Sequence, residues 1–366
     1  MHAQLIYQIA LTLVPQVGDV HARTLVQTFG DAASVFNARK RELELVEGIG
    51  SVRAASIKRF DNFIACETEI HFIEKYKITP LYFTDPQYPQ RLLNCYDCPS
   101  LLYFRGNAPL NQQRIVAVIG TRNNSDYGKQ VCEQIIAELA TENILVVSGL
   151  ALGIDTIAHK AALKNQLETV GVLAHGLDRI YPVSNKSLAR QMIEQGGLLT
   201  EFRSASNPDK QNFPKRNRIV AGISDLVLVI ETGIKGGSMI TAELANSYNR
   251  DVFALPGNIY HPQSEGCHYL IRSNKASLVT SAADVCKLMN WKQTKPHNQQ
   301  IQRQLFIELN PAEQQLYNIL QQREAVHIDE LFYKSNMSSS AVAAGLLSLE
   351  LQGVVISLPG KLYRIN

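Results

Sequence analysis

The chain has 366 residues, of which 45% are hydrophobic and 19% charged, and its formal net charge at pH 7 is +3. This length suits two or three globular domains, and so small a net charge excludes a surface that is basic all over. The apolar runs are only of strand length, and no basic segment precedes Leu5-Ile6-Tyr7. The sequence therefore predicts a cytoplasmic protein with no membrane span and no secretory leader.

Six cysteines are scattered along the chain, and Cys95 and Cys98 form its one CxxC pair. A structural zinc site normally needs a second pair of ligands, so we expect reduced thiols and no metal site. No sequence motif demands a nucleotide or any other cofactor.

Residues 1–77 are expected to form a small helical domain of the SAM or helix-hairpin-helix type. Two segments, Val14–Arg23 and Val46–Ala55, share a glycine-containing form. Such a turn permits a tight bend and places helix N–H groups where a phosphate can bind, but it also suits a helical turn without any ligand. Residues 78–113 form a connector punctuated by proline, in which Leu81–Phe83 and Leu101–Phe104 are predicted to be short edge strands.

Residues 114–290 alternate between predicted strands and helices, the pattern of a doubly wound, Rossmann-like α/β core. In such a core, ligands bind outside the carboxyl ends of the strands. The predicted strands are Ile115–Ile119, Ile144–Val147, Val170–Leu173, Leu198–Thr200, Leu226–Ile230, Val252–Ala254 and Leu278–Thr280, with helices at Tyr127–Leu139, Asp155–Leu163, Asn185–Gln195 and Met239–Tyr248 among them.

Residues 291–304 hold three basic and no acidic side chains, which indicates a flexible linker. Residues 305–366 then predict a winged helix-turn-helix, with helices at Pro311–Gln322 and Ile328–Lys334 and a third helix capped by Ser338. Strands Val354–Ser357 and Leu362–Ile365 flank a turn at Pro359-Gly360. The third helix contains no Lys or Arg, which a major-groove helix normally needs, so we expect a protein contact or a regulatory role rather than duplex binding.

Three glycine-containing turns follow predicted strands of the core: Gly120-Thr121-Arg122, Ser148–Gly153 and Gly233–Ser238. None matches a dinucleotide fingerprint or a P-loop, and each alone is compatible with simple packing. Together they offer backbone N–H groups, hydroxyls and a cation at one edge of the sheet. That combination favours a phosphate-rich ligand.

A basic cluster, Lys215-Arg216-Asn217-Arg218, follows Phe213-Pro214 and leads into apolar Ile219-Val220. The cations are either ligand contacts anchored by these neighbours or an ordinary solvated helix face. Phe213 is either a stacking platform for single-stranded bases or part of the core.

Asp155 and His159, four residues apart on one helix face, suggest catalysis, but no nucleophile elbow or ligand cluster accompanies them. We therefore interpret them as a helix-start carboxylate and a packed histidine, and we assign no catalytic residue. Glu231, Thr241 and Glu243 flank the third glycine turn and suit a ribose or a water molecule.

Six motifs follow one another in order between residues 100 and 285, and their content resembles the DNA-processing protein A (DprA/Smf) family. They are Val116–Arg122 with Tyr127-Gly128, Ser148–Asp155 with Ala158-His159, Gly176–Asp178 with Tyr181-Pro182, Phe213-Pro214 with Arg216–Ala221, Gly237-Ser238 with Thr241–Glu243, and Ala254–Gly257.

The resemblance implies a single-stranded DNA-binding protein that dimerises through its Rossmann-like core, protects incoming DNA in natural transformation, loads RecA and is not an enzyme. Loss of Arg122 or Arg216 should then weaken DNA binding without unfolding the protein. The implied DNA contacts are Arg122, Lys215, Arg216, Asn217, Arg218, Gly236, Gly237 and Ser238, with Gly120, Thr121, Ser148, Gly149, Lys210, Phe213 and Lys235 as additional candidates.

Two other classes stay open. One is a nucleotide-binding hydrolase of the lysine-decarboxylase-like group, whose loop has a Pro-Gly-Gly-x-Gly-Thr form. The corresponding loop here, Gly236–Glu243, departs from that form. The other is a structural adaptor, which would show no affinity for DNA at low salt.

Overall fold

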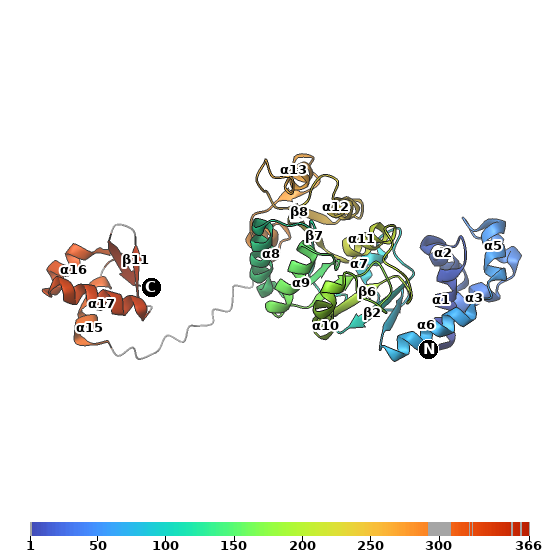
Figure 1. Ribbon diagram of the computed structural model, residues 1–366, viewed down its shortest axis with the longest axis horizontal. Helices are drawn as coiled ribbons and strands as arrows, with labels where there is room; N and C mark the ends of the chain where they lie inside the picture. The colour runs from blue at the N-terminus through green and yellow to red at the C-terminus, as the bar shows by residue number, and fades with distance from the viewer. Residues whose placement is uncertain are drawn as a thin grey trace. The chain divides into compact units, whose positions relative to one another are not determined.

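The computed structural model describes residues 2–291, 309–321, 323, 325–352, 354–358 and 361–365 (Figure 1). The chain divides into two compact units, residues 1–294 and 295–366. The predicted linker lies outside the described residues except for Trp291. The larger unit joins the N-terminal helices to the α/β core.

The first 75 residues form the predicted helical domain, which packs beside β2 of the core (Figure 1). Its two glycine turns meet, because Arg53 donates hydrogen bonds to the carbonyls of Gln16 and Gly48, both at 3.0 Å. Gly48 and Gly50 have φ values of 78° and 58°, which favour glycine. The helices are α1 (His2–Leu13), α2 (Asp19–Phe29), α3 (Ala32–Asn37), α4 (Lys40–Glu44), α5 (Gly50–Arg59) and α6 (Phe63–Lys75).

The core is a nine-stranded sheet in the order β1-β2-β6-β5-β4-β3-β7-β8-β9. The strands from β3 to β9 are parallel, and β2 pairs antiparallel with both β1 and β6. The proline-punctuated connector thus contributes two strands to the core sheet. The strands are β1 (Thr79–Tyr82), β2 (Leu101–Gly106), β3 (Ile115–Ile119), β4 (Leu145–Ser148), β5 (Thr169–Val172), β6 (Gly196–Thr200), β7 (Leu226–Val229), β8 (Asp251–Ala254) and β9 (Ser277–Leu278).

Helices cover both faces of this sheet, which confirms the doubly wound Rossmann-like prediction. Ile115 and Ala117 of β3 pack in one apolar cluster with residues of α11 and α12, whereas Val116 and Val118 pack with residues of α8 and α9 on the other face. The continuous apolar strands reflect burial on both sides. The helices are α7 (Gln90–Leu93), α8 (Asp126–Leu139), α9 (Ile154–Lys164), α10 (Lys186–Glu194), α11 (Asn212–Ile223), α12 (Gly237–Ser247), α13 (Glu265–Arg272) and α14 (Ala282–Leu288).

The strand order reverses direction at β3. From it the chain proceeds to β4, β5 and β6 on one side and to β7, β8 and β9 on the other, with Val116 in register between Val146 and Leu226. Ligand sites of open α/β sheets form at such a switch point, outside the carboxyl ends of the strands. The topology therefore directs attention to the turns that follow β3, β4 and β7.

The smaller unit is the predicted winged helix, with a sheet in the order β10-β12-β11. The Ser338 hydroxyl accepts a hydrogen bond from the Ala341 N–H at 3.3 Å, which confirms the predicted cap of the third helix. The turn at Pro359-Gly360 lies outside the described residues. The elements are α15 (Pro311–Leu320), β10 (Val326–His327), α16 (Ile328–Ser335), α17 (Ser339–Leu351), β11 (Val355–Leu358) and β12 (Leu362–Ile365).

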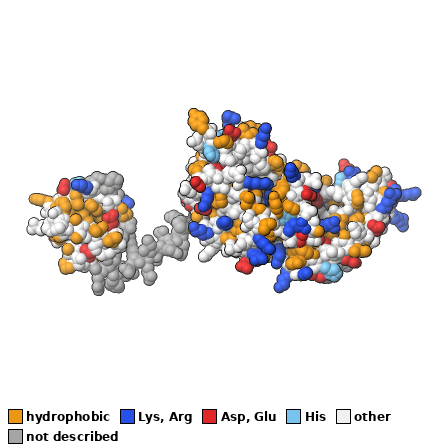
Figure 2. Space-filling view, viewed as in Figure 1, with side chains coloured by type: hydrophobic (Ala, Val, Ile, Leu, Met, Phe, Trp, Pro, Cys, Tyr) orange, Lys and Arg blue, Asp and Glu red, His pale blue; other side chains and the backbone are white. Residues whose placement is uncertain are grey.

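Lys and Arg side chains lie in several groups over the face of the larger unit in Figure 2, with acidic and apolar side chains between them. Within the described ranges, no helix is both long and apolar enough to cross a membrane.

Candidate functional site

The three glycine turns meet at the switch point and line one cavity of about 290 Å³. Turns after β3, β4 and β7 form its floor, and α11 forms a wall. The lining residues are Ile119, Gly120, Thr121, Arg122, Gly149, Ala151, Asp155, Phe213, Arg216, Asn217, Val220, Thr232, Gly233, Gly236, Gly237, Ser238 and Thr241.

The amino terminus of α12 opens into this cavity. Gly236 occupies the cap position, and no side chain of the described residues caps the helix. Gly237 is exposed with open space where a Cβ would stand, while the Ser238 hydroxyl donates to Thr232 Oγ1 at 2.7 Å. Uncapped N–H groups and the positive end of the helix dipole favour an anion at this position.

Arg216 projects from α11 into the base of the cavity and is only 6% exposed. Its Nη1 donates to the Val172 carbonyl at 2.8 Å, and its Nε has no hydrogen-bond partner among the described residues. Burial lowers the pKa of Arg216, and the Asp155 carboxylate opposes that shift. The guanidinium is thus held rigidly with part of its donor capacity unused.

Gly149 permits this arrangement because its neighbours occupy the space of a side chain. A Cβ on Gly149 would stand 1.9 Å from Arg216 Nη1 and 2.5 Å from Asp155 Oδ2. Packing alone therefore requires a glycine at position 149, whether or not a ligand binds. Burial also raises the pKa of Asp155, with Arg216 opposing the shift.

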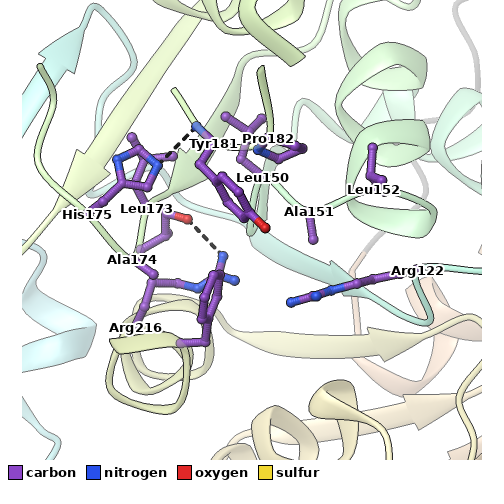
Figure 3. A pocket seen from close by; sticks show the side chains of 12 residues that line it. Arg122, Leu150, Ala151, Leu152, Leu173, Ala174, His175, Tyr181, Pro182 and Arg216 are labelled. Atoms are coloured by element: carbon purple, nitrogen blue, oxygen red, sulfur yellow. Dashed lines mark hydrogen bonds between the residues drawn. The ribbon is translucent and has the colours of Figure 1, made fainter. Parts of the chain in front are cut away.

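Arg122 lies at the mouth of the cavity and is exposed, with its guanidinium carbon 5.5 Å from the centre of the Phe213 ring. Beside it is a smaller recess of about 60 Å³, which shares Arg122, Ala151, Phe213 and Arg216 with the cavity. Figure 3 shows Arg122, Tyr181 and Arg216 converging on this space. The other walls are Leu150, Leu152, Val172, Leu173, Ala174, His175, Tyr181 and Pro182.

The remaining predicted contacts divide into three groups. Asn217 lines the cavity and donates from Nδ2 to the Gly237 carbonyl at 3.3 Å, joining α11 to α12. Lys210, Lys215 and Lys235 are exposed but do not line the cavity. Ser148 is fully buried and its hydroxyl donates to the Val118 carbonyl at 2.6 Å, so this residue stabilises the sheet rather than facing a phosphate.

Arg218 also lies away from the cavity. It pairs with Glu201 and with Asp19, the latter at 3.0 Å, and it donates to the Asp97 carbonyl. Burial opposes its charge, but Glu201 and Asp19 together raise the pKa of Arg218 above its ordinary value. Its charge is neutralised within the protein, which corrects the expectation that it contacts DNA.

The groups that suggested catalysis are engaged in structural contacts. His159 is fully buried; its Nε2 donates to the Gly149 carbonyl at 2.5 Å and its Nδ1 lies 2.6 Å from Thr169 Oγ1. Glu231 is buried and accepts hydrogen bonds from the Ser125 N–H and hydroxyl. Glu243 pairs with Lys275 at 3.1 Å. In the part of the chain that the structure describes, no group of three or more His, Cys, Asp or Glu residues is arranged to hold a metal ion.

Sequence reasoning assigned no site role to Tyr181 and Thr232, which line the recess and the cavity. Thr232 lies three residues after the end of β7, and Tyr181 lies in the loop after β5, so their positions after the carboxyl ends of strands could have identified them.

Comparison with known proteins now identifies the family. The family model for DNA recombination-mediator protein A matches residues 79–290, and the model for the DprA winged helix domain matches residues 303–361. The chain belongs to the DprA/Smf family. Its relative Protein Smf of Synechocystis is 32% identical, and the alignment covers 98% of each chain.

Two solved structures of family members are also similar. The X-ray structure of DprA from Streptococcus pneumoniae is 34% identical, with a TM-score of 0.64 over 77% of this chain and 97% of that one. DNA processing protein A from Helicobacter pylori, solved to explain its single-stranded DNA binding mode, is 30% identical, with a TM-score of 0.54 over 59% of this chain and 96% of that one.

Proposed function

We propose that this protein binds single-stranded DNA without reading its sequence, and that the switch-point cavity grips the strand. The observation that carries the proposal is the meeting of an uncapped helix terminus, the exposed Arg122 and the buried Arg216 around one cavity. Backbone amides and guanidinium groups bind phosphate oxygens, which every nucleotide carries.

Each element of the cavity has a distinct part in this proposal. The N–H groups of Gly237 and Ser238 hold one phosphate, and Arg216 supplies a fixed positive charge beneath it. Arg122 and Phe213 contact the neighbouring nucleotide at the mouth, where an aromatic ring suits any base. Lys210, Lys215 and Lys235 are exposed cations that add long-range attraction to the strand.

We further propose that the protein protects incoming strands and loads RecA in natural transformation, as a homodimer through its Rossmann-like core. Membership of the family supports this role, and the Helicobacter relative is described by its single-stranded DNA binding mode. A dimer presents two cavities to one strand, which raises the apparent affinity beyond that of either cavity alone.

The nucleotide-hydrolase alternative is weaker, and we propose a binding protein rather than an enzyme. Glu231, the carboxylate closest in sequence to the third glycine turn, does not line the cavity, is buried and already accepts two hydrogen bonds from Ser125. A general base must reach its substrate or a water molecule.

Photo-crosslinking tests the site directly. An oligonucleotide with 5-iodouracil at each position in turn is irradiated on the protein, and the crosslinked peptides are mapped by mass spectrometry. We expect crosslinks at Arg122, Phe213 and the turn before α12. Crosslinks confined to the N-terminal helices or to the winged helix would contradict the assignment.

A further inference from the structure

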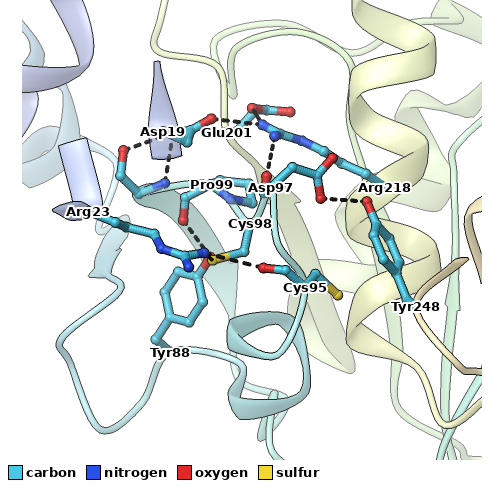
Figure 4. A network of polar contacts seen from close by, with 11 residues as sticks. Asp19, Arg23, Tyr88, Cys95, Asp97, Cys98, Pro99, Glu201, Arg218 and Tyr248 are labelled. Atoms are coloured by element: carbon cyan, nitrogen blue, oxygen red, sulfur yellow. Dashed lines mark hydrogen bonds and ion pairs between the residues drawn. The ribbon is translucent and has the colours of Figure 1, made fainter. Parts of the chain in front are cut away.

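Helices α11 and α12 both line the cavity, and both are hydrogen-bonded to one loop of the core, residues 95–100 (Figure 4). Arg218 of α11 donates to the Asp97 carbonyl, and the Tyr248 hydroxyl, just past α12, donates to Asp97 Oδ1 at 2.6 Å. Arg216 and Arg218 are two residues apart, so they point to nearly opposite sides of α11. Because both residues belong to one helix, we expect a shift of α11 at Arg218 to be transmitted to Arg216 in the cavity.

The N-terminal domain holds the same loop from the other side. Asp19 of α2 accepts hydrogen bonds from the Ser100 N–H at 2.8 Å and from its hydroxyl at 2.9 Å. Arg23, one turn further along α2, donates to the Cys95 carbonyl at 3.2 Å and to Cys98 Sγ at 2.7 Å. The second carboxylate oxygen of Asp19 accepts a hydrogen bond from Arg218.

A separate contact holds the segment that leads into α11. Glu69 of α6 is 4% exposed, and its Oε1 accepts from the Ser204 N–H at 2.9 Å. The N-terminal domain thus contacts the polypeptide both before α11, at Ser204, and within α11, at Arg218.

From these contacts we propose that the N-terminal domain sets the position of the two cavity helices, with Asp19 and Glu69 as positioning residues for DNA binding. Neither residue lines the cavity. The inference rests on the proposed function, since it concerns the affinity of the same cavity for a single strand. A partner that displaced the N-terminal domain would then lower the affinity for DNA without contacting the DNA site.

The sign of the effect of Asp19→Asn separates positioning from simple electrostatics. Removal of a carboxylate near a DNA site raises affinity if charge alone matters, because repulsion of the phosphates is reduced. Positioning predicts the opposite, an affinity for oligo-dT that is lower by roughly three- to tenfold. Glu69→Gln, which leaves Asp19 and Arg218 intact, is expected to act in the same direction.

The control is Arg114→Met, which breaks the buried pair of Arg114 with Glu142 before β3, at the end of the strands opposite the cavity. It should lower stability but leave DNA affinity unchanged. Fluorescence anisotropy in full-length protein measures affinity, and hydrogen exchange of residues 212–223 reports on α11 without DNA. We expect faster exchange there in Asp19→Asn and Glu69→Gln but not in Arg114→Met.

Unchanged or higher affinity in folded Asp19→Asn and Glu69→Gln, with wild-type protein binding normally, overturns the positioning role and leaves the proposed function intact. Should Asp19→Asn fail to fold, Glu69→Gln decides alone. Failure of the wild-type protein to bind oligo-dT overturns both proposals.

Discussion

The guanidinium of Arg122 stacks near the ring of Phe213, with its central carbon 5.5 Å from the ring centre. The two residues come from the turn after β3 and from α11, so they meet only in the folded core. An exposed arginine held by an aromatic ring retains its donors while losing little side-chain freedom on binding a ligand.

Arg122→Ala should therefore lower the affinity for oligo-dT by about tenfold, which corresponds to one charge-assisted hydrogen bond. The free energy of unfolding should stay within about 0.5 kcal/mol of wild type, as for other surface substitutions. Equilibrium binding and urea melts measure the two quantities. Arg272→Ala, at an exposed arginine of α13, is the matched control and should change neither.

Arg216→Ala is expected to act differently, because the buried Arg216 contributes to stability as well as to the proposed DNA contact. Removal of this side chain leaves the buried Asp155 without its facing cation and the Val172 carbonyl without its donor. We expect a loss of about 3 kcal/mol in the free energy of unfolding, together with weaker DNA binding. Urea melts at pH 7 test the first part, and a wild-type midpoint would contradict the buried position of Arg216.

Gly237→Ala separates access to the helix terminus from the stability of the fold. The added methyl group meets no atom within 4 Å, so the helix should be as stable as in wild type or slightly more so. Gly237 is the first residue of α12, so the methyl group should restrict access of a phosphate to the neighbouring N–H groups, and affinity for the strand should fall several-fold. Arg272→Ala is again the control and should leave affinity unchanged.

His159 should make the fold sensitive to mild acid. Burial lowers its pKa to about 4, whereas the unfolded chain has the ordinary value of 6.5. The unfolded state therefore binds more protons as the pH falls below 6.5, and stability is lost down to about pH 4. The loss from this group between pH 7.5 and pH 5 should be about 2 kcal/mol. In urea melts, the free energy of unfolding of His159→Gln should depend less on pH than that of wild type. An equal pH dependence in the two proteins would contradict this prediction.

The winged helix is expected not to bind duplex DNA tightly. Its third helix, α17, has no Lys or Arg, and Leu347 on this helix is 59% exposed. A chain ending at residue 294 should bind duplex DNA as weakly as the full-length chain in gel-shift assays. A marked loss of duplex affinity on truncation would show that this domain reads DNA.

The sequence predicted the sheet well because strands buried on both faces are continuous apolar runs, as in Ile115–Ile119 and Leu226–Val229. It also predicted the meeting of the three glycine turns, since parallel strands end at one edge. It did not distinguish Arg216 from Arg218, although both belong to one basic cluster. That difference depends on Asp19, which lies 199 residues away in the sequence, and on Glu201, which lies 17 residues away; both pair with Arg218. Ser148 was misjudged for a similar reason, because its partner carbonyl belongs to the neighbouring strand.

The central claim is that the protein binds single-stranded DNA through phosphate contacts. Fluorescence anisotropy of oligo-dT and matched duplex over a range of salt concentrations tests it most directly. We predict that the single strand binds more tightly and that its affinity falls with salt. The slope of log affinity against log salt should decrease by about 0.7 in Arg122→Ala, the value for one lost phosphate contact on a single strand. Absence of binding at low salt, or equal affinity for duplex and single strand with an unchanged slope in Arg122→Ala, would contradict the account.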